Sequence, residues 1–187
     1  MKNDDYWAER RIQKIALEEA AISRIAINLG ELGFKRKGKA LWRLAANGNT
    51  QRVHFQSTKR PDSAQLCPTI GVTSERLAAV LVAKKLAQRS EMHSAMFLAF
   101  IRPGQVGHRD TFFHIQDENR IDDAVLEVVT LLREFGVAWL DAHSADEVLI
   151  QDLLSIKNPI HNAWGRILSD LVLGKEVDFT ELGDIQL

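Results

Sequence analysis

The sequence predicts an α+β fold: a mostly antiparallel sheet of about five strands, with helices packed on one face. Three observations lead to this class. An amphipathic repeat follows residues 3–5, a hairpin signal is centred on Asn47-Gly48, and the pattern after residue 116 is helical. The resulting order is helix, three strands, helix, two strands and three helices, which is typical of an antiparallel sheet covered by helices.

The first helix is predicted to begin at a cap formed by Asn3, Asp4 or Asp5 and to end at Gly30 or Gly33. At about 24 residues it exceeds the usual globular helix of about 11–12 residues. The helix therefore either spans the back of the sheet, or its first half projects or packs on a partner chain. Packing on a partner chain would make a homodimer through the N-terminal helix. Its apolar side is expected to consist of Ile12, Ile15, Ile22, Ile25, Ala26 and Leu29.

The segment "KALWRLAANGNTQRVHFQSTKR", residues 39–60, predicts a β-hairpin. Asn47-Gly48 is the preferred pair for a two-residue type I′ turn, and such a turn places Arg43 opposite Arg52. Side chains alternate between the two faces of a strand, so this register also assigns the faces. The predicted core face consists of Trp42, Leu44, Val53 and Phe55, and the other face of Lys39, Arg43, Arg52, His54 and Gln56, interrupted by Leu41.

A third strand is predicted at residues 66–72, where Pro68 lacks a ladder donor and so indicates an edge position. A helix follows, with Ser74 as its N-cap. The apolar runs 95–101 and 111–115 then predict two strands that pair with each other.

The remaining chain is predicted to be helical. A helix that begins near residue 117 is expected to stop at Gly136, and Asn158-Pro159 should break the next one. We expect a single domain over residues 1–187. It would comprise an N-terminal helical extension (1–17), a core (18–158), and a C-terminal helix with an acidic tail (159–187).

Charge is distributed unevenly, although the net charge is −1. Residues 35–60 carry eight bases and no acid, whereas residues 110–152 are strongly acidic. One interpretation is that basic strands and acidic helices neutralise each other. The other is a basic hairpin face that attracts an acidic protein or a polyanion. Arg43 opposite Arg52 favours the second, because a like-charge cross-strand pair is destabilising unless an anion offsets it.

Several chemistries lack support in the sequence. The single cysteine, Cys67, rules out an intramolecular disulfide and favours a reduced, cytoplasmic protein. The chain has no glycine-rich phosphate loop and no metal-binding histidine motif, so we expect no cofactor, no metal and no assignable catalytic residue. The N-terminus lacks an apolar signal region, and no stretch approaches 18 apolar residues, so no membrane span is expected.

The segments "LGFKRKGKALWR", "VHFQST" and "TIGV", in this order, resemble the bacterial DUF4304 family. The resemblance extends over about residues 18–155 and departs at Phe112-Phe113, where the family often has tryptophan. It implies an uncharacterised domain with no established catalytic residue. It also marks Phe34, Lys35, Phe55, Gln56 and Ser57 as family-like, and a buried Gln56 bonded to the backbone would be a structural reason for this.

Two functions follow from these observations. The favoured one is a non-catalytic binding module that engages an acidic protein or a polyanion through its basic hairpin face. The alternative is an enzyme with a histidine-assisted site between sheet and helices, using His54 or His114 as a base. We favour the first because the second rests only on the placement of both histidines in predicted strands. The candidate binding residues are Lys39, Arg43, Arg52, His54 and Gln56.

Overall fold

The computed structural model describes residues 4–57, 63–83, 99–101, 112–155, 159–173 and 175. The chain forms two compact units. Unit 1 comprises Met1–Leu44, Gln51–Gly71 and Phe100–Asp141, and unit 2 comprises Ala45–Thr50, Val72–Ala99 and Ala142–Leu187. The predicted division into an N-terminal extension, a core and a C-terminal part stays a prediction.

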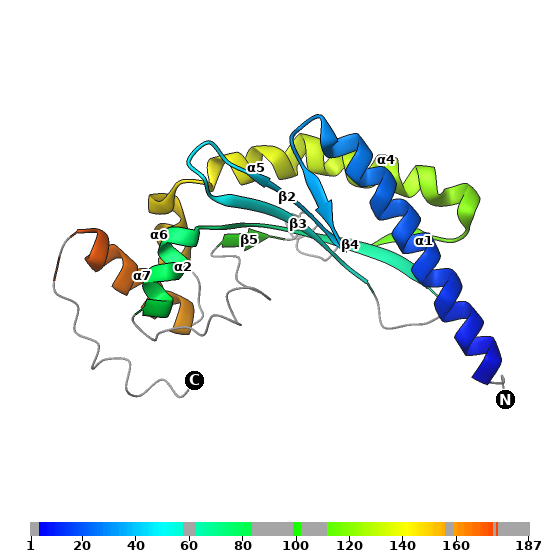
Figure 1. Ribbon diagram of the computed structural model, residues 1–187, viewed down its shortest axis with the longest axis horizontal. Helices are drawn as coiled ribbons and strands as arrows, with labels where there is room; N and C mark the ends of the chain where they lie inside the picture. The colour runs from blue at the N-terminus through cyan, green and yellow to red at the C-terminus, as the bar shows by residue number, and fades with distance from the viewer. Residues whose placement is uncertain are drawn as a thin grey trace. The chain divides into compact units, whose positions relative to one another are not determined.

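The α+β fold with a mostly antiparallel sheet is confirmed. The strands follow the order β1 (Lys35–Lys37), β2 (Ala40–Leu44), β3 (Thr50–Gln56), β4 (Ala64–Thr73) and β5 (Ala99–Ile101) (Figure 1). A sixth strand, β6 (Phe113–Ile115), pairs antiparallel with β4. The described part of the chain thus contains one strand more than predicted, and the addition is β1.

Two predictions about the later strands are wrong. Pro68 does not mark a sheet edge, because β4 has β3, β5 and β6 as hydrogen-bonded neighbours. Pro68 lies beyond residues 64–66, which form the pairs with β6, so its missing N–H interrupts none of them. In the described residues β5 and β6 each pair with β4 rather than with one another.

Helix α1 (Asp4–Gly30) ends at the predicted glycine. Its second half is buried through Ile22, Ile25 and Leu29, whereas Ile12 and Ile15 are exposed. The predicted apolar side is therefore wrong for these two residues. Homodimerisation through this helix stays a prediction. No helix in the described part of the chain is long and apolar enough to cross a membrane.

The helical segment after β6 runs further than predicted. Gly136 does not end it, because the chain continues through a π-helical turn into a further short helix. A Cβ at Gly136 would lie 3.0 Å from Leu132 Cδ2, so the glycine serves close packing rather than termination. The extension places Asp141 within hydrogen-bonding distance of Arg43 in β2. The elements are η2 (Glu118–Arg120), α4 (Ile121–Leu131), η3 (Leu132–Gly136) and α5 (Val137–Ala142).

Unit 2 is mainly helical and contains α2 (Glu75–Ala83), α6 (Asp146–Ser155) and α7 (Pro159–Val172). Ser74 caps α2 as predicted, since its Oγ accepts a bond from Leu77 N at 3.3 Å. Helices α6 and α7 approach closely at Gly165, where a Cβ would lie 2.9 Å from Leu154 N. The break predicted at Asn158-Pro159 is confirmed, because α7 begins at Pro159.

The hairpin between β2 and β3 has a three-residue loop, one residue longer than predicted. Gly48 N donates to Ala45 O at 2.9 Å, and Ala45 N donates to Asn49 O at 2.8 Å, so Ala45 pairs with Asn49. A bond of 2.9 Å from Phe55 N to Lys39 O shows the same register at the far end. Gly48, at φ +86°, supplies the left-handed residue that such a loop requires. The predicted two-residue turn is therefore wrong.

A shift of one residue changes which side chains share a face. Leu41 now lies opposite Val53, and both are buried together with Phe55. Trp42 and Leu44 lie on the other side, where Trp42 is half-buried and Leu44 is 63% exposed. The predicted core face is confirmed for Val53 and Phe55 and wrong for Trp42 and Leu44.

Helices α1 and α4 pack against each other and lie on one side of β2 and β3 (Figure 1). Arg36, which pairs with the buried Leu41, reaches Ser23 of α1 from this side. We call this side of β1–β3 the first face and the opposite side the second face.

Candidate functional site

The five predicted binding residues do not share a face. Lys39, directly before β2, and Arg43 within it alternate with Ala40 and Trp42 and lie on the first face. Side chains alternate in the same way along β3. The other three predicted binding residues lie on the second face; they are Arg52, His54 and Gln56.

Arg43 is held by several partners within unit 1 and is only 15% exposed. Its guanidinium donates to Gln51 Oε1, to Leu32 O at 3.1 Å and to Asp141 Oδ1 at 2.6 Å. It also lies over the ring of Phe34, 4.8 Å from the centroid. This set of contacts gives Arg43 a structural role.

Gln51 lies opposite Arg43, so the predicted like-charge pair of Arg43 with Arg52 does not form. Gln51 is buried and donates to Leu140 O at 3.0 Å. Gln51 therefore has the two properties that the sequence suggested for Gln56, a buried position and a hydrogen bond to the backbone. Gln56 itself is exposed. The extension of the helical segment into α5 supplies Leu140 as the partner of Gln51.

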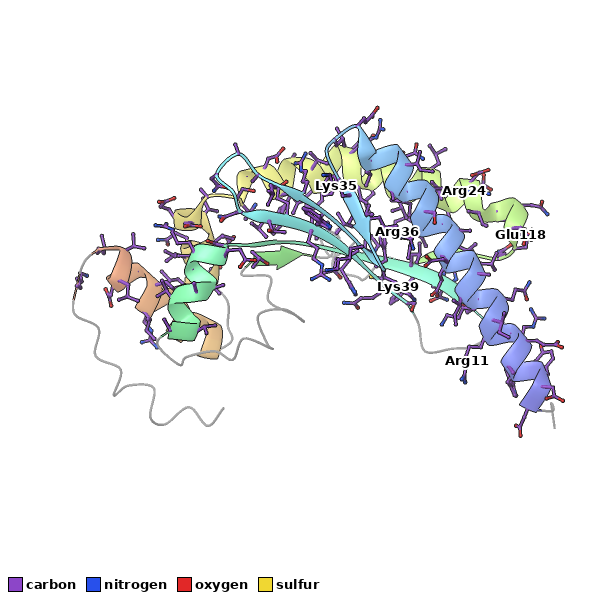
Figure 2. All side chains as sticks on the ribbon, in the orientation of Figure 1. Arg11, Arg24, Lys35, Arg36, Lys39 and Glu118 are labelled. Atoms are coloured by element: carbon purple, nitrogen blue, oxygen red, sulfur yellow. The ribbon has the colours of Figure 1, made fainter. Side chains whose placement is uncertain are left out.

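The other first-face bases are also paired with acids. Lys39 Nζ donates to Glu18 Oε2 at 2.9 Å, and Arg36 forms an ion pair with Glu19. Figure 2 shows Arg36 of β1 and Lys39 of the turn before β2 beside α1. Neutralisation of basic strands by helices thus applies to this face, and the acids come from α1 as well as from the acidic segment 110–152.

The second face carries a different set of bases, the second-face cluster, defined as Lys35, Lys37, Arg52 and His54. The two lysines of β1 are exposed, and the other two residues are half-buried. The registers of β1 with β2 and of β2 with β3 arrange the cluster in two adjacent cross-strand rows. These rows are Lys35–Trp42–Arg52 and Lys37–Ala40–His54.

The sequence analysis did not include the two lysines among the candidate binding residues, because β1 was not predicted as a strand. Its three residues are all basic, so they give no apolar alternation. The available signal was Gly38, which takes φ +59° between β1 and β2. A glycine within a short basic run is a weak sign of a turn, yet here it places a strand at the end of the sheet order.

The pKa of His54 is lowered from its ordinary value of 6.5. The largest cause is partial burial, which disfavours the charged imidazolium, and the positive charges of Arg52 and Lys39 act in the same direction. The two smaller causes of the lowered pKa show that the positive charges of Arg52 and Lys39 act on His54.

Replacement of His54 by glutamine is expected to reduce the amount of unfolding free energy that the protein loses in mild acid. Because the folded pKa lies below 6.5, the unfolded chain binds a proton first as the pH falls. Wild-type stability should therefore be fully present above about pH 6.5 and decline below it, and the variant should decline less. Urea unfolding at about pH 7.5 and 5.5 measures this. Parallel declines of the two proteins would contradict the assignment.

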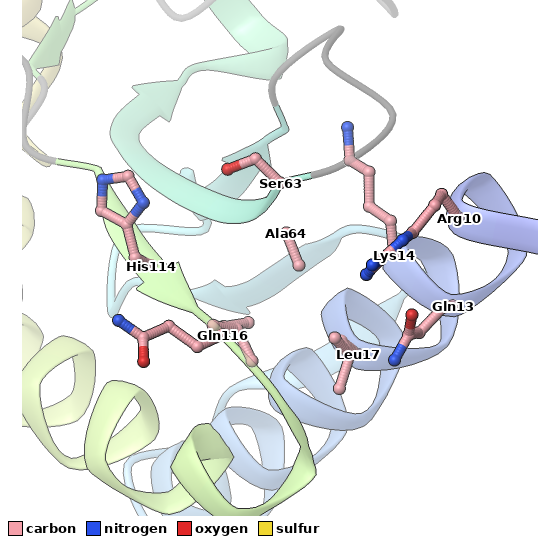
Figure 3. Close-up of a pocket in the computed structure, with 9 residues that line it drawn as sticks. Arg10, Gln13, Lys14, Leu17, Ser63, Ala64, His114 and Gln116 are labelled. Carbon is pink, nitrogen blue, oxygen red and sulfur yellow. The ribbon is translucent and has the colours of Figure 1, made fainter. Parts of the chain in front are cut away.

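A cavity of about 260 Å³ lies within unit 1, between α1 and strands β4 and β6. Figure 3 shows its polar side chains projecting from three segments that are distant in sequence. Of the two predicted histidine bases, His114 lines it. The polar residues are Arg10, Gln13 and Lys14 from α1, Ser63 before β4, and His114 and Gln116 at β6.

The described residues contain no group of three or more histidine, cysteine or acidic side chains that could hold a metal ion. The positively charged lining of the cavity is likewise unsuited to a cation. Among the described residues, the second-face cluster and the cavity are candidate sites for a ligand.

These elements define an α+β domain with basic surfaces and no recognisable catalytic motif. The chain belongs to the family described as domain of unknown function DUF4304, whose model matches residues 25–142. The match confirms the resemblance seen in the sequence over a somewhat shorter range. Comparisons with curated proteins and with solved structures give no match.

Proposed function

We propose that the protein is a non-catalytic binding module that engages an acidic protein or a polyanion through the second face of its sheet. The observation that carries the proposal is the second-face cluster, with two adjacent rows of bases across three strands. No acid occurs between Glu31 and Asp62, so these three strands supply no compensating charge. We also propose that the protein works in the cytoplasm, in keeping with its single cysteine.

The arrangement of charge within the cluster supports this function. Its bases lie on β1 and β3, on either side of β2, so an anion laid across the rows would be attracted from both strands. The lowered pKa of His54 has Arg52 and Lys39 among its causes, as expected in such a field. On the first face, the acids of α1 and α5 form ion pairs with the strand bases.

The neighbouring side chains suit a folded partner as well as a polymer. Half-buried Trp42 lies between Lys35 and Arg52, and Leu44 on the same face is exposed. Tryptophan and arginine are enriched among the contact residues of protein interfaces.

Loss of the two β1 lysines is expected to weaken binding to heparin and to short DNA or RNA by about tenfold or more. The double variant Lys35→Gln/Lys37→Gln should lower the slope of log K against log salt by about 2, because each lysine releases about one counterion. Fluorescence anisotropy in a salt series measures both quantities.

The matched control is Arg24→Gln/Arg133→Gln, which removes the same charge from exposed pairs with Asp122 and Glu31. It should leave the salt slope unchanged. Equal affinities and slopes for the two double variants would show that only overall charge matters, and the second face would no longer be supported.

A second candidate is the enzyme with a histidine-assisted site between sheet and helices. One observation favours it, since His114 lines the cavity between α1 and β6. A screen of hydrolase substrates in which wild type and His114→Gln give equal rates would remove this candidate.

A further inference from the structure

We propose that the cavity between α1, β4 and β6 is a binding site for a small phosphate-type anion, either inorganic phosphate or a phosphomonoester group. The site is separate from the second-face cluster and does not depend on its function. Two cations, Arg10 and Lys14, line the cavity, and no acidic residue does. They are four residues apart on α1, so their side chains lie on the same side of the helix.

The charges next to the cavity also favour an anion. Lys14 is 9% exposed and lies 3.8 Å from Glu18 Oε1, while the other oxygen of Glu18 accepts a bond from Lys39. One buried carboxylate thus lies between two ammonium groups, which leaves this triad with a net charge of about +1. Arg10 adds a further positive charge at the cavity wall. A bound dianion would match the surplus.

The hydrogen bonds of Gln65 fix two further groups as donors to a ligand. Its Nε2 donates to Ser63 Oγ at 2.6 Å and lies 3.0 Å from His114 Nδ1. An amide nitrogen can only donate, so Nδ1 is the acceptor and the proton of the neutral imidazole is on Nε2. Ser63 Oγ already accepts a bond, which leaves its hydroxyl proton for another partner. Both side chains line the cavity.

The number of donors selects phosphate over carboxylate. A guanidinium, an ammonium, a hydroxyl, an imidazole N–H and two side-chain amides surround the cavity (Figure 3). A carboxylate has two oxygens to accept these bonds, whereas a phosphate group has at least three and carries nearly two charges near pH 7. Arg10 supplies the planar fork that binds such groups through paired bonds.

The size of the cavity limits the ligand. Its volume of about 260 Å³ is below the range of about 300–1,000 Å³ typical of pockets for drug-sized molecules. The cavity therefore suits a phosphate or the phosphate end of a small metabolite, and it is too small for a polymeric anion. This restriction separates the site from any binding of polymers on the second face.

Titration calorimetry with inorganic phosphate near pH 7 tests the proposal, using Arg10→Gln and its matched control Arg11→Gln. Both arginines are exposed on α1, but only Arg10 lines the cavity. We expect Arg10→Gln to weaken phosphate binding by about tenfold or more and Arg11→Gln to leave it within about twofold. Ser63→Ala should weaken binding as well, and Lys35→Gln/Lys37→Gln should not change it.

Sulfate should compete with phosphate, and acetate should bind at least about tenfold more weakly. The proposal is overturned if wild type shows no saturable phosphate binding, if the two arginine variants lose affinity equally, or if acetate binds as tightly. Broadening of the phosphate ³¹P NMR signal on addition of the protein provides a second readout for weak binding. Circular dichroism of each variant confirms that a lost signal does not reflect unfolding.

Discussion

Replacement of Glu18 by glutamine is expected to lower the free energy of unfolding by about 3 kcal/mol. Glu18 is 1% exposed and interacts with Lys14 and Lys39. Glutamine keeps the shape but removes the negative charge, and it can present an amide donor to the lysines. The penalty arises mainly at Lys14, because an ammonium group in a buried position is costly once its carboxylate is lost.

The adjacent acid of the same helix is the control. Glu19 forms an ion pair with Arg36, but its side chain is 55% exposed. Exposed pairs contribute about 0–1 kcal/mol, so Glu19→Gln should have a correspondingly small effect. Urea denaturation of the three proteins gives the comparison. If the two variants lose stability equally, Glu18 is not the buried charge of a coupled triad.

Replacement of Leu41 by alanine is expected to cost about 2–5 kcal/mol of unfolding free energy. Leu41 has 0% exposure and lies opposite the buried Val53. The substitution removes the packing of a large side chain and leaves a cavity on the first face, which the surrounding structure can fill only in part.

Leu44 provides the matched comparison within the same strand. It is 63% exposed on the second face, and Leu44→Ala should change stability by no more than about 0.5 kcal/mol. The register predicted from the sequence gives the opposite order, because it places Leu44 in the core and Leu41 outside. The chemical denaturation midpoints of these two variants therefore decide the register in solution.

The sequence predicted the features that depend on local pattern. The helix ending at Gly30, the hairpin near Asn47-Gly48 and the cap at Ser74 all follow from residue types with strong conformational preferences. The burial of Val53 and Phe55 follows from simple alternation. Each of these signals lies within a few neighbouring residues.

Features that depend on tertiary contacts were predicted less well. A three-residue loop with Gly48 in a left-handed conformation uses the same residues as a two-residue turn, so sequence alone did not distinguish them. Gly136 resembled a helix stop, but its lack of a Cβ serves packing against Leu132. The cavity combines α1, β4 and β6, and no local pattern links Arg10 to His114.

The length of the hairpin loop determines which bases lie on the first face, beside the helices, and which lie on the second face. With the loop Ala46–Gly48, β2 turns Lys39 and Arg43 toward acids of α1 and α5, and β3 turns Arg52 and His54 away. Loss or gain of one loop residue would exchange the faces of one strand relative to the other. Within such a family, a single-residue insertion or deletion in this loop would therefore change the charge of a whole sheet face without replacing a single charged residue.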